Sequence, residues 1–393
     1  MTTCTFPAPS APRPQTGSDH LPAHPVPYLF LALLTGLWVT MGGGTVSAAE
    51  SAAPVVLGQP FWESSKMRDE PLLFIQAQGQ SVATAKLLFV PRSPPRLTSG
   101  DLQTVYVDGK DYLWKPGTDV LERTSRSRIP FKTAAQMSPP RGSPHSLAGV
   151  LWSEGRYFHD LQVLATYQHN ASLPWPPAWP QPLLTRSLAR LRARQPFTIV
   201  ALGDSITEGY NASGFAKVMA PPFEPPYPQL VANTLQQRFG ARVALVNLAV
   251  AGTRAQWGLT RTDQVVAAKP DLVILAFGMN DNEPPPVFGA TMRRLVAAVQ
   301  AGVPQADIVL VAGMTGNPRI IPTARFIGYR DALRQLVRTN VALADVTTPW
   351  LDLLKHKPFT DLTGNGLNHP NDFGHRLYAQ LICALFPARA GGK

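Results

Sequence analysis

The sequence predicts an all-β sandwich domain followed by a three-layer α/β/α domain built on a parallel sheet. Before about residue 170 the apolar runs are short, rich in β-branched and aromatic residues, and separated by turn signals. After residue 195, continuous apolar runs alternate with helical stretches, which is typical of strands that are covered on both faces. The length of 393 residues also exceeds what one hydrophobic core usually supports.

The first segment is expected to be a secretory signal. Residues 28–41 are apolar throughout except for two threonines and a glycine, and this run is shorter than the roughly 20 residues that span a bilayer. Val46 and Ala48 then fit the small-residue pattern of a cleavage site. We therefore expect a signal peptide over residues 1–48 and a secreted, periplasmic or envelope location, with an uncleaved signal anchor as the alternative.

The β-sandwich is expected over residues 55–170. Its candidate strands are residues 72–75, 87–90, 104–114 and 157–167. Residues 104–114 contain Asp108-Gly109, a dipeptide typical of a two-residue hairpin turn. No convincing helix is expected there, and a Pro- and Arg-rich linker is expected over residues 171–194.

The α/β domain is expected over residues 195–388, with a flavodoxin-like arrangement. Its expected strands are residues 197–202, 243–248, 272–277, 308–312 and 341–344. Its expected helices are residues 229–239, 291–301, 329–339 and 372–386. In the last helix Phe373, Leu377 and Leu381 recur every four residues, which predicts one buried stripe.

Polar residues follow these strands in an order that suggests a single site. They are Ser205 after the first strand, Gly252 after the second, Asn280 after the third and His369 before the last helix. Ligands of an open parallel sheet bind at the carboxyl ends of its strands. A serine there attacks a carbonyl carbon when an imidazole removes its proton. The N–H groups of Ser205 and Gly252 and the amide of Asn280 would then bind the oxyanion.

These motifs resemble the blocks of the SGNH (GDSL-type) hydrolase superfamily. GDSIT at 203–207, Gly252, GMND at 278–281 and HPND at 369–372 match its four blocks, and the resemblance covers residues 195–388. It implies that Ser205 is the nucleophile, that Gly252 and Asn280 complete the oxyanion hole, and that His369 is the general base. It also implies catalysis without a metal or cofactor, and no cluster in the sequence has the spacing of metal ligands.

One position departs from the family pattern. An acidic residue usually stands three positions before the histidine, and here that position is Gly366. Loss of the acid in a serine protease costs about 10⁴ in rate. Two hypotheses follow: Asp361 folds back to serve as the acid, or a backbone carbonyl accepts the imidazole N–H in a Ser-His dyad, which we favour.

The expected function is therefore that of an exported serine esterase. Because two-domain members of the superfamily include carbohydrate esterases, the expected substrate is an acyl ester, most simply an acetyl ester, of a carbohydrate. A lipolytic esterase or an acyltransferase with the same serine is one alternative. A non-catalytic carbohydrate-binding envelope protein, inactive through loss of the acid, is the other.

The net charge of +11 gives information about possible binding partners rather than about the reaction. No nucleic-acid recognition motif is present, so nucleic acid is not an expected partner. The densest basic cluster is Arg186, Arg190, Arg192 and Arg194. We expect this cluster to form a basic interdomain face that suits anionic glycans or an envelope surface.

Overall fold

The computed structural model describes residues 55, 57–175 and 183–387. The expected signal peptide and residues 176–182 of the expected linker lie outside these ranges. Within them, no helix has both the length and the apolar character that crossing a membrane requires.

The α/β domain is built on five parallel strands. They are β12 (Phe197–Gly203), β13 (Val243–Asn247), β14 (Leu272–Ala276), β15 (Asp307–Ala312) and β16 (Val341–Asp345). Their order across the sheet is β13-β12-β14-β15-β16. The five expected strands are confirmed. Because the order reverses at β12, the carboxyl end of that strand is where a ligand site is expected.

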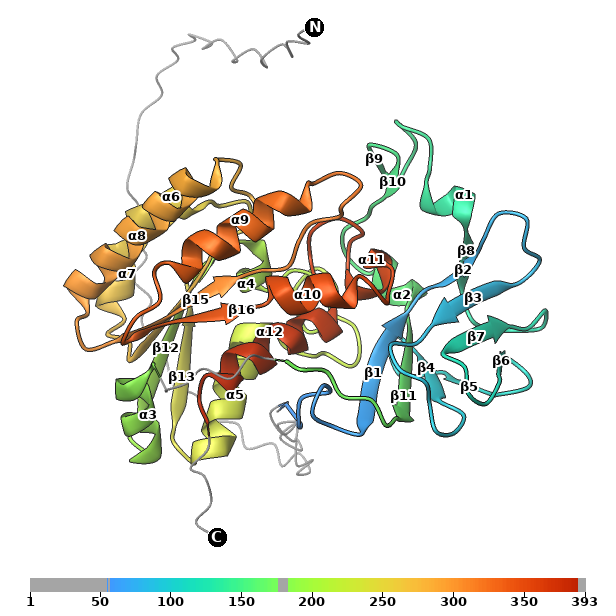
Figure 1. Ribbon diagram of the computed structural model, residues 1–393, viewed down its shortest axis with the longest axis horizontal. Helices are drawn as coiled ribbons and strands as arrows, with labels where there is room; N and C mark the ends of the chain where they lie inside the picture. Colours follow the sequence, from blue (N-terminus) through green and yellow to red (C-terminus); the bar gives the residue numbers. More distant parts are fainter. Residues whose placement is uncertain (1–54, 56, 176–182, 388–393) are drawn as a thin grey trace, which may run out of the picture. The chain divides into compact units, whose positions relative to one another are not determined.

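Helices cover both faces of this sheet (Figure 1). Alternate strand residues separate into two apolar clusters, so that Ile199 and Ala201 face one layer while Val200 and Leu202 face the other. The first layer contains α5 (Tyr227–Phe239) and α12 (Asp372–Ala384). The second contains α6 (Ala255–Gly258), α7 (Thr262–Ala267), α8 (Pro285–Gly302) and α9 (Thr323–Arg334).

The helix expected over residues 329–339 lies earlier in the chain. Pro322 caps α9 with an extended backbone, and the helix ends at Arg334. Beyond it the chain reverses through Asn340, which has a positive φ of 66°, and Arg338 pairs with Val341 as β16 begins. Residues 329–334 are therefore helical as expected, whereas residues 335–339 form the link to β16 instead of the end of the helix.

The β domain precedes the α/β domain, as expected. One sheet has the order β1 (Lys66–Leu72), β11 (Val163–Gln168), β4 (Arg96–Ser99), β5 (Val105–Tyr106). A second has the order β6 (Tyr112–Trp114), β7 (Val120–Arg123), β3 (Ala83–Lys86), β2 (Phe74–Gln76), β8 (Phe131–Thr133). A small hairpin joins β9 (Ser146–Leu147) and β10 (Val150–Leu151). All these strands pair antiparallel except β2 with β8.

The expected hairpin over residues 104–114 is wrong. Gly109 does form a turn, with φ +78°, but β5 and β6 belong to different sheets. The buried carboxylate of Asp111 accepts a hydrogen bond from the Val107 N–H at 2.9 Å and pairs with Arg128 at 2.6 Å. These contacts turn the chain from one sheet to the other.

Two further strand predictions need correction. Residues 87–90 form no strand, because side chains bind their amides: the Leu88 N–H donates to Glu70 Oε1 at 2.8 Å, and the Phe89 N–H donates to the Tyr167 hydroxyl at 3.2 Å. The stretch 157–167 begins as helix α2 (Tyr157–Leu161) and becomes strand β11 only at Val163. Another short helix, α1 (Ala134–Met137), also lies in this domain.

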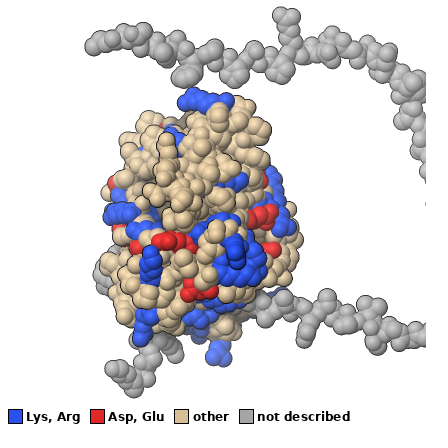
Figure 2. Space-filling view, turned by 90° about the vertical axis from the view of Figure 1, so that its right-hand side faces the viewer, with Lys and Arg blue, Asp and Glu red and all other residues tan. Residues whose placement is uncertain are grey.

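The arginine cluster lies on helix α3 (Thr185–Arg192) and just beyond it, inside the expected linker. The Ser187 N–H donates to Asp307 Oδ2 at 2.8 Å, and Arg190 pairs with Asp271 at 2.8 Å. Asp271 and Asp307 stand at the amino ends of β14 and β15. The expected interdomain basic face is therefore wrong, since α3 covers the end of the sheet opposite to the ligand end. On the β-domain side of the molecule, basic and acidic side chains are interspersed (Figure 2).

A buried ionic cluster joins the two domains. Lys357, which follows helix α10 (Thr347–Leu353), donates to Glu70 Oε1 of the β domain at 2.5 Å and to the Lys86 carbonyl at 2.9 Å. The Tyr167 hydroxyl donates to the other oxygen of Glu70, at 2.5 Å. Every polar atom of the Lys357 and Glu70 pair is thereby withdrawn from solvent, and both side chains are fully buried.

Candidate active site

Ser205 lies where β12 ends and the short helix α4 (Ser205–Glu208) begins. Asp204 caps this helix, with its Oδ1 accepting the Ile206 N–H at 3.1 Å. Gly203 allows the turn because a Cβ at that position would lie 2.5 Å from the Ala276 carbonyl of the neighbouring strand. The nucleophile candidate is therefore held by the packing of β12 against β14.

His369 meets Ser205 across the carboxyl end of the sheet. Its Nε2 is 2.9 Å from Ser205 Oγ. His369 precedes α12, whose first turn is capped by the Asn371 side chain. Ser205 is 4% exposed and His369 5% exposed, so this hydrogen bond is shielded from bulk water. The structure thus brings the two predicted residues together.

The expected oxyanion donors gather next to this pair. The loop that carries Gly252 is tied to the nucleophile segment, since the Val250 N–H donates to the Gly203 carbonyl at 3.1 Å. Gly252 has φ +76°, and no atom lies within 4 Å of a Cβ built on it. The positive φ favours glycine at this position, and the space that a side chain would occupy is empty of protein atoms. Within the described ranges the Gly252 N–H makes no hydrogen bond.

Asn280 reaches the same loop from the end of β14. Its Nδ2 donates to the Thr253 carbonyl at 3.1 Å, and Thr253 is the neighbour of Gly252. One hydrogen of this amide therefore fixes the side chain, and the second remains available to a ligand.

Two buried carboxylates hold these strand ends in place. Burial raises the pKa of Asp204 to about 7 and that of Asp281 to about 6. Asp281 Oδ1 accepts the Ala255 N–H at 3.0 Å, which fixes the start of α6. Their hydrogen bonds go to backbone amides, so both carboxylates support the loops rather than the serine.

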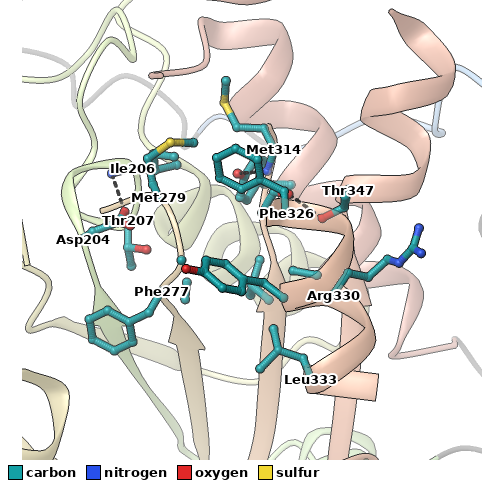
Figure 3. Close-up of a pocket in the computed structure, with 17 residues that line it drawn as sticks. Asp204, Ile206, Thr207, Phe277, Met279, Met314, Phe326, Arg330, Leu333 and Thr347 are labelled. Atoms are coloured by element: carbon teal, nitrogen blue, oxygen red, sulfur yellow. Dashed lines mark hydrogen bonds between the residues drawn. The ribbon is translucent and has the colours of Figure 1, made fainter. Parts of the chain in front are cut away.

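A pocket lies behind the nucleophile turn, between the ends of β12, β14 and β15 and helix α9 (Figure 3). Its lining includes Ile206, Met279, Met314 and Phe326, and it contains neither Ser205 nor His369. This pocket is therefore distinct from the Ser205–His369 pair.

The second nitrogen of His369 faces three side chains that the sequence analysis did not identify. Nδ1 is 2.9 Å from Asn211 Oδ1, 3.0 Å from Asn365 Nδ2 and 3.4 Å from Glu154 Oε1. Asn211 follows the nucleophile helix and Asn365 lies in the Gly-rich turn before His369, so both stand near recognised motifs. Glu154 comes from the β domain, and no local pattern marks it.

Neither predicted partner of Nδ1 occupies that position. Asp361, in the short helix α11 (Phe359–Leu362), accepts the Leu73 N–H at 3.0 Å and pairs with Lys357 at 3.1 Å. It belongs to the buried ionic cluster because the turn folds toward the β domain, and burial raises its pKa to about 6. Across the described residues, no backbone carbonyl accepts a hydrogen bond from Nδ1 either. Both predictions for the partner of His369 Nδ1, the Asp361 carboxylate and a backbone carbonyl, are therefore wrong.

Comparison with known families agrees with this geometry. Residues 201–377, which contain all four motifs, match the model of the GDSL-like Lipase/Acylhydrolase family. These residues lie within the α/β domain, so the similarity to this family belongs to that domain.

Solved structures that resemble the chain include esterases and other GDSL proteins. A two-domain esterase (CEX) active on acetylated mannans, co-crystallised with mannopentaose, is 23% identical with a TM-score of 0.43, over 51% of this chain and 52% of that one. Axe2, an acetylxylan esterase from Geobacillus stearothermophilus, is 20% identical with a TM-score of 0.38, over 50% and 95%. A lipolytic protein of the G-D-S-L family from Veillonella parvula is 15% identical with a TM-score of 0.37, over 48% and 97%.

The chain thus spans about half the length of the two-domain esterase. No curated protein matches it significantly.

His375, which lies within the last helix α12, has a structural role. His375 Nε2 donates to the Tyr210 carbonyl at 3.0 Å, and Nδ1 accepts the Tyr227 N–H at 3.4 Å. Burial lowers the pKa of His375 to about 4. A neutral ring with both nitrogens bound to backbone supports the loop after the nucleophile. In the described part of the chain, no group of three or more His, Cys, Asp or Glu side chains is placed to hold a metal ion.

Proposed function

We propose that this protein hydrolyses carboxylic esters by nucleophilic catalysis, with Ser205 as the nucleophile and His369 as the general base. The observation that carries the proposal is the 2.9 Å hydrogen bond between Ser205 Oγ and His369 Nε2 at the carboxyl end of the parallel sheet. A serine and an imidazole at this separation are the pair that acyl transfer requires.

The chemistry follows from the positions of the donors. His369 Nε2 takes the proton of Ser205 as Oγ attacks the acyl carbon. The oxyanion is received by the N–H groups of Ser205 and Gly252 and by Asn280 Nδ2. The imidazolium then protonates the departing alkoxide, and water releases the acyl group by the reverse sequence of proton transfers.

The proposed substrate is a short acyl ester, such as an acetyl ester, of a carbohydrate. Ser205 is almost fully buried, which favours a small acyl group at the reacting carbon. Beside Asn280 the rim is polar: Arg254 donates to Asn282 Oδ1 at 3.1 Å and lies 3.8 Å from Glu283. Such side chains suit the hydroxyl groups of a sugar better than an alkyl chain. The aromatic residues of the β domain offer less support, because Trp62, Tyr106 and Tyr112 are core residues.

Labelling with a fluorophosphonate tests the nucleophile. The folded protein is expected to form one adduct, on Ser205, and Ser205→Ala is expected to abolish both labelling and ester hydrolysis. Ser125→Ala, a change of an exposed serine in the β domain, is the matched control and should leave both intact. A folded, unlabelled wild-type protein would instead favour a carbohydrate-binding function without catalysis.

A substrate panel tests the acyl group and the leaving group. We expect hydrolysis of p-nitrophenyl acetate and release of acetate from acetylated xylan or mannan, with activity falling as the acyl chain lengthens. Preference for long-chain esters would favour the lipolytic alternative. Accumulation of a transferred ester when acceptor alcohols are added would favour an acyltransferase.

Export and surface attachment are proposals that rest on the sequence. We propose cleavage after Ala48, which the mass of the mature protein isolated from its native source will check. Association with anionic glycans is proposed from the net charge of +11, and retention on an acidic polysaccharide column at low salt tests it.

A further inference from the structure

Position 366, where the family usually places its acid, has no room for a side chain. Gly366 has φ +81°, and a Cβ built there would overlap the Leu151 carbonyl oxygen and lie 2.7 Å from Phe158 Cζ. Both obstacles belong to residues 151–158 of the β domain. The segment that excludes a side chain from position 366 therefore packs against the turn that precedes His369.

The same segment carries Glu154. It is anchored on the turn before His369, since the Ser153 N–H donates to the Asn365 carbonyl at 3.1 Å. Asn365 Nδ2 then donates to Glu154 Oε1 at 2.9 Å, which holds that oxygen 3.4 Å from His369 Nδ1. The carboxylate is thus positioned by bonds from the α/β domain itself.

Counting hydrogens fixes the proton on Nδ1. Asn365 Nδ2 has two hydrogens, and Glu154 Oε1 and Asn368 Oδ1, each at 2.9 Å, accept them. Asn211 Nδ2 donates to the Gly364 carbonyl at 3.0 Å, so its Oδ1 faces His369 as an acceptor. Nδ1 must therefore be the donor, which leaves Nε2 free to accept the proton of Ser205.

We propose that Glu154 is the missing acid, a positioning residue that acts through His369 together with Asn211. This inference rests on the proposed function of the Ser205–His369 pair. Asn211, a neutral acceptor, sets the tautomer, and the carboxylate of Glu154 supplies the negative charge that stabilises the imidazolium formed during attack. The active site is then completed by a residue of the β domain.

The charge at Nδ1 predicts a specific phenotype for Glu154→Gln. This variant keeps the size of the side chain and an oxygen for Asn365 but removes the charge. Because Asn211 still fixes the tautomer, we expect kcat/KM to fall by about 10- to 100-fold, by analogy with the loss of the hydrogen-bond partners of metal-binding histidines. This fall is smaller than the roughly 10⁴ that follows a wrong tautomer. The fall should lie mainly in kcat, since the charge acts on the transition state.

The pH profile separates this role from a structural one. Without the carboxylate the imidazolium is less stable, so the acid limb of the kcat/KM profile should move to lower pH. The other titratable groups around the imidazole and its carboxylate are Lys217, Tyr210 and His375, and all are unchanged in the variant. Asp160→Asn, which removes an exposed carboxylate of the same domain, is the matched control and should change neither kcat/KM nor the position of the acid limb. Glu154→Asp should recover part of the lost kcat/KM and part of the shift of the acid limb.

The outcomes are distinguishable. Ser205→Ala without effect on hydrolysis would overturn the proposed function. A Ser205-dependent activity that Glu154→Gln leaves within twofold of wild type, with an unmoved acid limb, would overturn the role of Glu154 alone. So would a loss of activity without any pH shift in a variant that melts at a lower temperature than wild type, since that is the signature of a structural role.

Discussion

At the scale of single residues, two glycines at positive φ separate the steric cost of adding a side chain from the cost of backbone strain. Gly366 and Gly79 have nearly the same φ, +81° and +78°, yet a Cβ added at Gly79 would have no atom within 4 Å, while one added at Gly366 would meet Leu151 and Phe158. The two positions thus allow backbone strain to be measured with and without a steric clash.

Gly366→Ala is expected to lower the free energy of unfolding by more than about 3 kcal/mol, because strain and overpacking add. Gly79→Ala should cost only about 1 kcal/mol, from strain alone. Urea unfolding followed by tryptophan fluorescence measures both. Equal losses in the two variants would show that the β-domain segment does not press on position 366.

His375 makes stability depend on pH. Its pKa falls from 6.5 to about 4 on folding, so between these values the unfolded chain binds a proton that the native protein does not. Stability from this group is complete above pH 6.5 and is lost as the pH falls toward 4, by about 3 kcal/mol in total. In His375→Gln, the slope of unfolding free energy over that range should flatten, while the exposed-site control His356→Gln should retain it.

At the scale of elements, the strands of the α/β domain were the most predictable part of the fold. β12, β14 and β15 are apolar at almost every position because both faces of the sheet are covered, and local sequence records that directly. The strand predicted at residues 87–90 failed because a carboxylate and a hydroxyl distant in sequence bind its amides. Ser205 and His369 stand in recognisable motifs, whereas the position of Glu154 depends on how residues 151–158 dock, which no local pattern encodes.

The turn after α10 supplies the lysine that joins the elements of the two domains. Lys357→Met would leave Glu70 and Asp361 buried without their cation, so we expect a loss of about 3 to 5 kcal/mol in unfolding free energy. Lys355→Met removes an exposed lysine, 70% accessible, that pairs with Asp352 and should cost less than about 1 kcal/mol. Denaturant midpoints of the two variants provide the comparison, and similar values would contradict a stabilising role for the buried cluster.

At the scale of the whole molecule, the β domain and the α/β domain, as far as the structure describes them, form one compact unit rather than two independent ones. The ionic cluster around Lys357 and the contact of residues 151–158 with Gly366 cross from one domain to the other, so the domains are expected to unfold together. Hydrogen exchange measured by mass spectrometry should give peptides from β11 and β14 the same free energy of global opening. Earlier loss of protection in β11 alone would show that the β domain opens separately.

The position of residues 151–158 also has a consequence for when the active site forms during synthesis and refolding. Glu154 is synthesised before Ser205 and well before His369, and the carboxylate reaches the imidazole only after the last helix has closed against the earlier part of the chain. Hydrolysis at full rate should therefore appear late in refolding, after the secondary structure of both domains has formed. The nascent chain would stay nearly inert toward esters until it is assembled, so the onset of activity reports that assembly.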